Sequence, residues 1–219
     1  MSAGPDVRTI AVTTHGRYLV EAPAGAGPWP VLLGFHGYAE AAGVQLVHLT
    51  RLDPAGAWLR VSVQGLHRFY TRQQDVVASW MTREDRDLAL ADNIAYAEAV
   101  RAAVDASYAT TGAFVAVGFS QGAAQAYRAG LAGGRACAGI LALGGDLPPD
   151  VAERAAALPP VLIGRGSDDP WYSAEVLAAD VAQLEAAGVH YTVCEFAGGH
   201  EWAPTFVATA SAWLASRRG

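Results

Sequence analysis

The pattern Gly118-Phe119-Ser120-Gln121-Gly122 joins an apolar run, Ala113 to Val117, to a helix-like pattern that begins at Gln121. A serine between a strand and a helix in a G-x-S-x-G pattern is typical of a nucleophile elbow. The glycines two positions before and after the serine remove side chains that would collide in such a sharp, strained turn. The pattern therefore predicts that Ser120 presents its hydroxyl above a sheet, as the nucleophile of an acyl transfer.

A serine hydroxyl reacts only when a base removes its proton, and the base needs a third group to orient it. Gly198-Gly199-His200 follows a predicted strand that ends at Phe196, which makes His200 the candidate base. Asp168 and Asp169 follow another predicted strand, and either could supply the carboxylate. Pro170 favours an extended Asp169 whose side chain points away from the next helix, so we favour Asp169 as the acid.

The turn Gly34-Phe35-His36-Gly37-Tyr38 closes the first long predicted strand. In acyl transfer a carbonyl oxygen becomes an oxyanion, which two aimed backbone N–H groups stabilise. One predicted donor is the amide of Gln121, directly after the nucleophile. The other is the amide of Tyr38, because Gly37 lets the chain turn inward before it. We expect His36 to be structural.

The rest of the chain alternates short apolar runs with longer amphipathic ones. The runs predict strands over 31–35, 58–63, 113–117, 138–143, 161–163 and 191–196, and helices over about 43–52, 83–107, 122–131, 173–187 and 204–217. An opening hairpin of strands is predicted over 7–14 and 17–22. This alternation predicts an α/β fold, with a mostly parallel central sheet and helices on both faces, in a single domain over 1–219. Because the carboxyl ends of parallel strands share one edge, Ser120, Asp169 and His200 can converge there.

Residues 64–82 have no clean period, and their length and aromatic content favour a functional loop that caps a pocket. Aromatic side chains near the predicted catalytic edge are candidates for lining that pocket, with burial in the core as the alternative. The candidates for substrate binding are Phe69, Tyr70, Trp80, Trp171 and Tyr172.

Composition argues against several classes of partner. The net charge is −6 and all 15 basic residues are arginine, so nucleic acid is not expected as a partner. Arg68, Arg72, Arg83 and Arg86 cluster in the sequence and could meet an anionic ligand, although solvated arginines are the simpler interpretation. Neither H-E-x-x-H nor a Cys/His cluster nor G-x-G-x-x-G occurs, so we expect no metal and no cofactor.

No run of eighteen apolar residues and no basic leader followed by an apolar stretch is present. We therefore expect no membrane span and a cytoplasmic location. Cys137 and Cys194 lie in apolar segments without C-x-x-C spacing, which favours buried thiols over a disulfide. The sequence leaves the oligomeric state open.

These motifs together resemble those of the α/β-hydrolases, and within that fold the phospholipase/carboxylesterase family, which includes acyl-protein thioesterases. The resemblance covers most of the chain and is carried by four segments: 35–37, 118–122, 166–169 and 199–200. It implies a triad of Ser120, Asp169 and His200 and an oxyanion hole at Tyr38 and Gln121. The segment 64–80 and the tyrosine at 38 depart from the family's usual pattern, which puts a preference for long acyl chains in doubt.

The expected function is a cofactor-free serine hydrolase that cleaves small-molecule carboxylic esters through an acyl-enzyme intermediate. The same triad would serve a thioesterase, an acyltransferase or a peptidase. A protein that kept the fold but only binds a small ligand is the alternative from another class.

Overall fold

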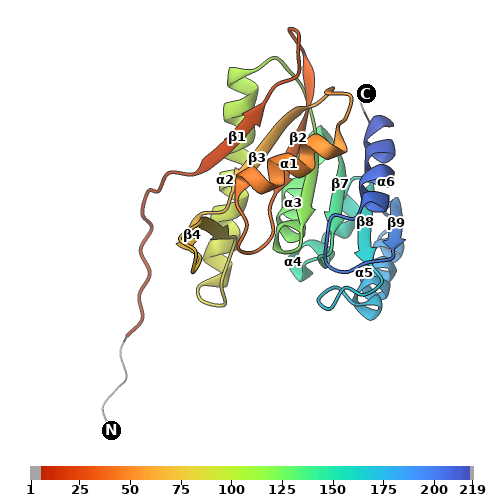
Figure 1. Cartoon of the computed structure of the whole chain (residues 1–219). Coiled ribbons are helices and arrows are strands. Elements are labelled where there is room, and N and C mark those ends of the chain that lie inside the picture. The colour runs from red at the N-terminus through yellow and green to blue at the C-terminus, as the bar shows by residue number, and fades with distance from the viewer. Residues whose placement is uncertain (1–5, 218–219) are drawn as a thin grey trace.

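The computed structural model describes residues 6–217, and its centre is a seven-stranded sheet (Figure 1). The strand order is β1-β3-β2-β6-β7-β8-β9, and only β1 runs antiparallel to its neighbour within this sheet. The bounds are β1 Arg17–Glu21, β2 Trp29–Phe35, β3 Leu59–Gln64, β6 Thr110–Phe119, β7 Cys137–Leu143, β8 Val161–Gly166 and β9 Tyr191–Phe196. The predicted α/β class with a mostly parallel sheet is confirmed.

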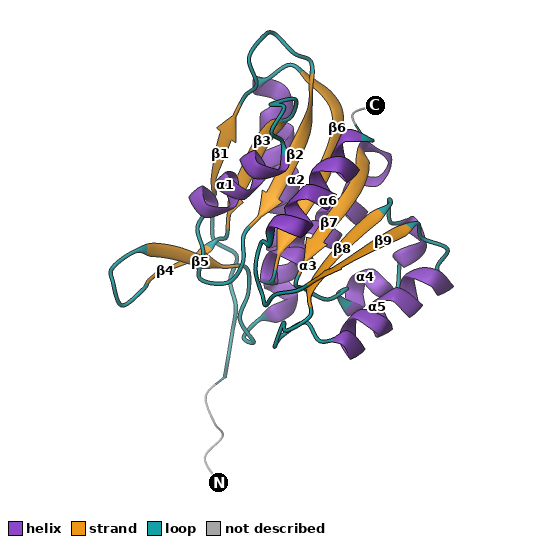
Figure 2. Cartoon of the chain, turned by 45° about the vertical axis from the view of Figure 1, so that its right-hand side comes forward, coloured by secondary structure: helices purple, strands orange, loops and turns teal. Residues whose placement is uncertain are grey.

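Helices cover both faces of the sheet (Figure 2). Side chains of α1 (Ala42–Leu52) and α6 (Pro204–Ala215) pack into one apolar cluster. Side chains of α2 (Arg86–Ser107), α3 (Gln121–Gly133) and α5 (Ala174–Ala186) pack into the other cluster, with the short α4 (Pro149–Ala152) beside them. The two clusters lie on opposite faces of the same strands.

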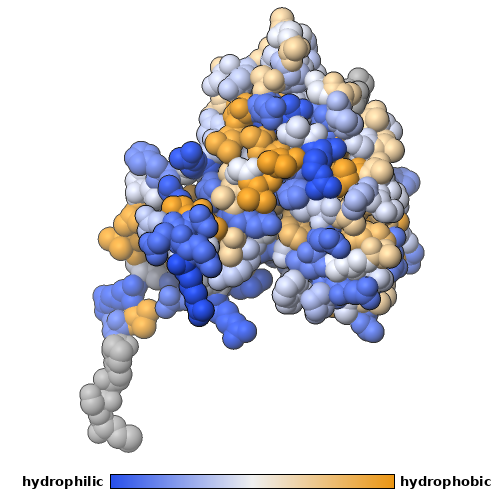
Figure 3. All heavy atoms as spheres, viewed as in Figure 1, coloured by the Kyte–Doolittle hydropathy of each residue, from blue (hydrophilic) through white to orange (hydrophobic). Residues whose placement is uncertain are grey.

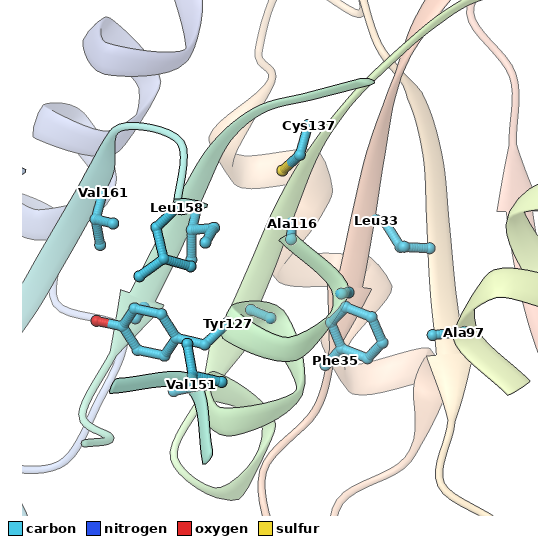
Figure 4. Close-up of a cluster of buried hydrophobic side chains, with 14 of the residues drawn as sticks. Leu33, Phe35, Ala97, Ala116, Tyr127, Cys137, Val151, Leu158 and Val161 are labelled. Atoms are coloured by element: carbon cyan, nitrogen blue, oxygen red, sulfur yellow. The ribbon is translucent and has the colours of Figure 1, made fainter. Parts of the chain in front are cut away.

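Strand β2 shows why its sequence is a continuous apolar run. Val31, Leu33 and Phe35 belong to the cluster on the α2 and α3 face, whereas Leu32 belongs to the cluster under α1 and α6. A strand buried on both faces needs apolar residues at successive positions. Figure 4 shows the larger cluster, in which Tyr127 of α3 is fully buried.

The carboxyl ends of the strands are aligned at one edge. The pairs Phe35↔Gly118, Phe119↔Leu143 and Gly166↔Phe196 are in register. Strand β2 has β3 on one side and β6 on the other, so the direction of strand succession reverses between β2 and β6. Ligands of open α/β sheets bind in the crevice at such a point.

The predicted opening hairpin is wrong. Residues 6–16 run as irregular chain away from the sheet (Figure 1), and β1 pairs antiparallel with β3 instead. Val7, Ile10 and Val12 are 83%, 88% and 78% exposed. Their local β-propensity has no sheet edge and no core to pack against, and propensity alone does not form a strand.

Residues 64–82, predicted as a loop, contain an antiparallel hairpin of β4 (His67–Tyr70) and β5 (Val76–Ser79). The hairpin projects from the side of the domain (Figure 2). Its turn closes when the amide of Thr71 donates to the carbonyl oxygen of Asp75 at 2.9 Å. The next helix, α2, begins at Arg86 without a side-chain cap, rather than at Arg83.

The face seen in Figure 3 mixes hydrophilic and hydrophobic residues, and the partly exposed Val44 and Val47 of α1 contribute to the exposed apolar surface. Among the described residues, no helix combines the length and the apolar character that crossing a bilayer requires.

Asp180 fastens α5 to the loops at the carboxyl edge of the sheet. Its Oδ2 accepts hydrogen bonds from the amide of Leu147 at 3.0 Å and from the hydroxyl of Tyr172 at 2.9 Å. The residue is 3% exposed. Burial is the main cause that raises the pKa of Asp180 to about 6, and it outweighs the lowering by the two hydrogen bonds.

We predict that Asp180 makes the folded protein less stable as the pH rises from about 4 to about 7. The folded state holds the Asp180 proton more tightly than the unfolded chain does, so this contribution is present below the unfolded pKa and is lost as the pH passes the folded pKa of about 6. We compare the free energy of unfolding of the unchanged protein with that of Asp180→Asn, each measured by urea titration. The advantage of the unchanged protein over the variant should fall by about 1–3 kcal/mol over this pH range.

The matched control is Asp92→Asn, at an exposed aspartate of α2. Its difference from the unchanged protein should not vary with pH in the same way. A difference for Asp180→Asn that is constant from pH 4 to pH 7 would contradict the prediction.

Candidate active site

Ser120 lies in a strained turn between β6 and α3. Its backbone angles are φ 54° and ψ −122°, outside the regions that non-glycine residues normally adopt. The amide of Ser120 donates to the carbonyl oxygen of Leu143 at 2.8 Å, and its own carbonyl oxygen accepts from the amide of Ala123 at 2.9 Å. Strain of this kind persists only where surrounding contacts fix it, and it clusters at functional sites.

The two glycines of the elbow are required by close backbone approach. A Cβ atom at Gly118 would overlap the carbonyl group of Gly122. A Cβ atom at Gly122 would overlap the carbonyl oxygen of Phe35 and lie 2.5 Å from that of His36. The first turn of α3 therefore packs directly on the end of β2, which brings Ser120 beside the turn that follows Phe35.

His200 and Asp169 form a hydrogen-bonded pair. Nδ1 of His200 lies 2.7 Å from Oδ2 of Asp169, and their side chains are 10% and 1% exposed. The carboxylate can only accept, so Nδ1 carries a proton, and in the neutral form of the ring Nε2 holds the lone pair. An imidazole in this tautomer can take a proton through Nε2.

The environment keeps Asp169 ionised at neutral pH. Burial alone would raise its pKa, but the amides of Tyr172 and Trp171 and the ring of His200 outweigh burial, and the net effect lowers the pKa of Asp169. The two amides donate to Oδ1 at 3.0 Å and 2.9 Å, leaving Oδ2 for His200. Both oxygens of the carboxylate are thus fixed in direction.

The neighbouring aspartate faces elsewhere. Asp168 is exposed, and its amide donates to the carbonyl oxygen of Gly198 at 2.9 Å. Of the two residues between which the sequence left a choice, Asp169 is the one in contact with His200.

Ser120 and His200 line the same cavity, of about 450 Å³. The ring of His200 contacts Phe119 and Trp171, with centroid distances of 4.7 Å to each. The other lining residues are Gly37, Tyr38, Glu40, Phe119 and Trp171. The structure thus brings the predicted nucleophile, the predicted base and the turn after β2 to one cavity.

The two predicted oxyanion donors come from different elements on either side of Ser120: Tyr38 lines this cavity, and Gln121 follows Ser120 directly and lines a second cavity that Ser120 also lines. Within the described residues, the Tyr38 amide has no hydrogen-bond acceptor. The amide of Gln121 is the first of α3, where a helix leaves its N–H groups unpaired and its dipole favours negative charge. Gly37 is held by a 2.8 Å hydrogen bond from its amide to Oε2 of Glu40.

Strand β5 and the residues after it hold both donor segments in place. Ala39 donates to the carbonyl oxygen of Ala78 at 3.0 Å, and Ala78 donates back to Glu40 at 2.8 Å. The side chain of Gln121 accepts from the amide of Trp80 at 2.9 Å and donates to the carbonyl oxygen of Met81 at 3.2 Å. Sequence reasoning missed this function of the hairpin, for which the apolar run at 76–78 was the available signal.

His36 is structural, as expected. Its Nε2 accepts from the amide of Gly65 at 3.0 Å, so Nδ1 carries the proton and donates to the carbonyl oxygen of Gly37 at 2.7 Å. Burial lowers the pKa of His36 and keeps the ring neutral, against the opposing effect of the bond to Gly37.

The aromatic residues predicted for substrate binding divide into two groups. Besides the cavity that it shares with His200, Ser120 lines a second cavity, of about 530 Å³. Trp171, 74% exposed, lines both cavities, and Tyr172 lines the second. Trp80 lines neither: it is 1% exposed, packs on Phe35 and donates from Nε1 to the carbonyl oxygen of His36 at 2.8 Å.

Phe69 and Tyr70 also lie outside these two cavities. Phe69 contacts the ring of Tyr38 at 5.8 Å, and Tyr70 is 67% exposed on the hairpin. From residues 64–82, only Met81 and Thr82 line a cavity shared with Ser120. The predicted cap thus supports the site from the side more than it covers it.

Over residues 6–217, no group of three or more His, Cys, Asp or Glu side chains has the arrangement of a metal site. Cys137 and Cys194 are buried free thiols.

Comparisons with known proteins agree with the predicted fold and family. A family model described as phospholipase/carboxylesterase matches residues 75–217. A search of curated proteins finds no match.

Several solved structures are similar in fold. Esterase PE8 has a TM-score of 0.72 at 25% identity, covering 92% of this chain and 98% of its own. The Bacillus cereus carboxylesterase has 0.69 at 20% identity, covering 92% and 94%. Zea mays acyl-protein thioesterase 2 has 0.68 at 20% identity, covering 94% and 100%.

The family match spans well over half of the chain and includes the elbow, the aspartate loop and the histidine loop. The chain belongs to the phospholipase/carboxylesterase family, whose members are serine hydrolases of the esterase and thioesterase type with the α/β-hydrolase fold.

Proposed function

We propose that this protein hydrolyses carboxylic esters of small molecules, with Ser120 as the nucleophile, His200 as the general base and Asp169 as the group that orients His200. The observation that carries the proposal is the 2.7 Å contact between Asp169 and His200 at a cavity that Ser120 also lines. The strained backbone of Ser120 supports it, because such strain is retained where function requires it.

In the proposed reaction, Nε2 of His200 takes the proton of the Ser120 hydroxyl as Oγ bonds to the carbonyl carbon of the ester. The amides of Tyr38 and Gln121 stabilise the resulting oxyanion, and each such donor typically lowers the barrier by about 3–4 kcal/mol. His200 then gives its proton to the leaving alcohol, and an acyl-enzyme remains. Water, activated by the same imidazole, releases the acid and restores Ser120.

A thioester is the second candidate substrate class. The similarity to Zea mays acyl-protein thioesterase 2 favours it, and a thiolate leaving group makes the same use of Ser120 and of the two amides. Oxygen ester, thioester and amide substrates with the same acyl group, assayed side by side, would separate an esterase from a thioesterase and from a peptidase.

The direct test is covalent labelling by a fluorophosphonate, read out by mass spectrometry of the modified peptide. We expect one label per chain, at Ser120, and parallel loss of p-nitrophenyl acetate hydrolysis. Failure to label Ser120, together with saturable binding of a small ligand that is unchanged in Ser120→Ala, would instead indicate a binding protein without turnover.

We predict that Asp169→Asn lowers kcat for p-nitrophenyl acetate by about 10,000-fold, because an amide in place of the carboxylate no longer fixes the tautomer of His200. The adjacent Asp168→Asn is the matched control. Its side chain is exposed, and its effect on kcat should be within about threefold. Similar losses in the two variants would exclude the proposed function of Asp169.

Gly144 lies against the proposed His200 and Asp169 pair. A Cβ atom at Gly144 would be 2.9 Å from Cε1 of His200, 3.0 Å from its Nδ1 and 3.3 Å from Oδ2 of Asp169. Its φ is 63°, which also favours glycine. The residue thus leaves room for the imidazole at the end of β7.

We predict that Gly144→Ala lowers kcat about 100-fold or more, since a small displacement of a catalytic group has effects of this size. Gly188→Ala is the control, because Gly188 has a similar φ of 69° but no atom within 4 Å of an added Cβ. Both variants should lose about 1 kcal/mol of stability from backbone strain, measured by thermal unfolding. Equal activity in the two would mean that Gly144 does not control the position of His200.

A further inference from the structure

Ser120 also lines a second cavity, of about 530 Å³, which His200 does not line. Three arginines, Arg83, Arg86 and Arg128, contribute to its wall, and Asp146 is the one carboxylate among its lining residues. Gln121, whose backbone amide is a predicted oxyanion donor, and Trp171 also line this cavity. The nucleophile therefore lies at the meeting point of two cavities of different charge.

The three arginines differ in how far their charge is compensated. Arg128 is buried and forms a two-point ion pair with Asp150, through Nε at 2.9 Å and Nη2 at 2.8 Å, while its Nη1 is buried without a partner. The side chains of Arg83 and Arg86 are exposed, and neither forms a hydrogen bond or an ion pair with another residue in the described part of the chain. Besides the Arg128 pair with Asp150, the charged lining residues are two arginines and one aspartate, so their formal charges sum to a positive value.

Acidic residues lie near the two arginines. The hydrogen bond from Arg128 is the main cause that lowers the pKa of Asp150, and the charge of Arg86 adds to this lowering. Glu84 and Asp85 lie between the two arginines in the sequence, but they line a different cavity, together with Arg8 and Asp92. Solvation of Arg83 and Arg86 is the simpler interpretation of two exposed arginines. The position of the two arginines argues against this simpler interpretation, because in a chain of net charge −6 both line the cavity that Ser120 lines.

The geometry of the proposed reaction assigns a part of the substrate to each cavity. The leaving oxygen must come within reach of His200 to receive its proton, so the leaving group occupies the cavity that His200 lines. The acyl group extends from the same carbonyl carbon in another direction. It is left with the second cavity, on the side of Gln121 and the arginines.

We propose that the second cavity binds an acyl group that ends in a carboxylate, and that Arg83 and Arg86 hold this carboxylate. The preferred substrates are then monoesters of dicarboxylic acids, a specificity that rests on the ester hydrolysis proposed above. A guanidinium fork matches the two oxygens of a carboxylate. The apolar lining residues Ala124, Pro148 and Val176 suit the methylene chain between the two ends.

The remote carboxylate takes no part in bond changes. The bond from Ser120 Oγ to the acyl carbon forms as the bond to the alcohol oxygen breaks, and His200 passes the proton to that oxygen. Water then cleaves the acyl-enzyme, so the products are one alcohol and one dicarboxylate. The positive wall acts on substrate binding and on its orientation.

The activity test compares benzyl monoesters of succinic, adipic and suberic acid with benzyl esters of neutral acyl groups of matched length, by chromatography of the released benzyl alcohol. We expect kcat/KM to favour at least one carboxylate-bearing ester. In the double variant Arg83→Gln with Arg86→Gln, the ratio of the charged to the neutral ester should fall about 5- to 25-fold, the product of two partly exposed charge contacts.

Arg72→Gln is the matched control, because Arg72 is an exposed arginine in the turn of the β4–β5 hairpin and lines neither cavity. It removes one of the two positive charges that the double variant removes, at a site away from both cavities, and should leave the ratio unchanged. An unchanged ratio in the double variant, or an equal fall in Arg72→Gln, would overturn the assignment.

A binding test is independent of turnover. In Ser120→Ala, calorimetry should show tighter binding of adipate than of hexanoate, and the difference should shrink between about 50 mM and about 500 mM NaCl and in the double arginine variant. Equal affinities for the two acids would overturn the proposal even if the protein is an esterase. Preferential adipate binding without labelling of Ser120 would retain the anion site and reject the proposed function.

Discussion

The close approach of Gly122 to the carbonyl oxygens of Phe35 and His36 is the contact on which the rest of the site depends. Because no side chain separates them, the first turn of α3 lies directly against the end of β2. Ser120, the amide of Gln121 and the turn that carries the amide of Tyr38 are thereby held within one small volume. A larger residue at 122 would collide with these carbonyl oxygens and separate the elbow from the turn after β2.

The hairpin adds a second constraint to the same region. Backbone hydrogen bonds join Ala78 to Ala39 and Glu40, and the side chain of Gln121 is bonded to the backbone of Trp80 and Met81. One short segment after β4 therefore fixes both sides of the predicted oxyanion hole. Preorganised donors are effective because they need no rearrangement when charge develops. No residue of β4 or β5 lines the cavity that Ser120 and His200 share, yet the hairpin determines how rigidly the two amides are held.

The sequence predicted those parts of the structure that depend on local chain geometry. Gly118 and Gly122 mark a sharp turn, and Ser120, Asp169 and His200 each follow a strand, so a parallel sheet must bring them to one edge. It failed where burial or pairing depends on distant segments. Residues 7–14 have the pattern of a strand but pair with no other strand. Trp80 and Trp171 were both predicted to bind substrate, although the first is 1% exposed and the second 74%. Only the fold distinguishes an indole that donates to His36 from one that borders a cavity.

Under the proposed assignment, charged side chains determine the orientation in which an ester binds to a site whose fold is shared with many hydrolases. Glu40 lies on the leaving-group side, where burial raises its pKa, while the amide of Gly37 and the nearby His200 lower it in part. The arginines lie on the acyl side. An ester with an anionic acyl end would be attracted by one cavity and repelled by a carboxylate in the other, so its reversed orientation is disfavoured. The backbone of the elbow makes Ser120 reactive, whereas side chains on α2 and on the loop before it determine substrate specificity. Because different segments determine the two properties, reactivity and specificity can vary independently in this fold.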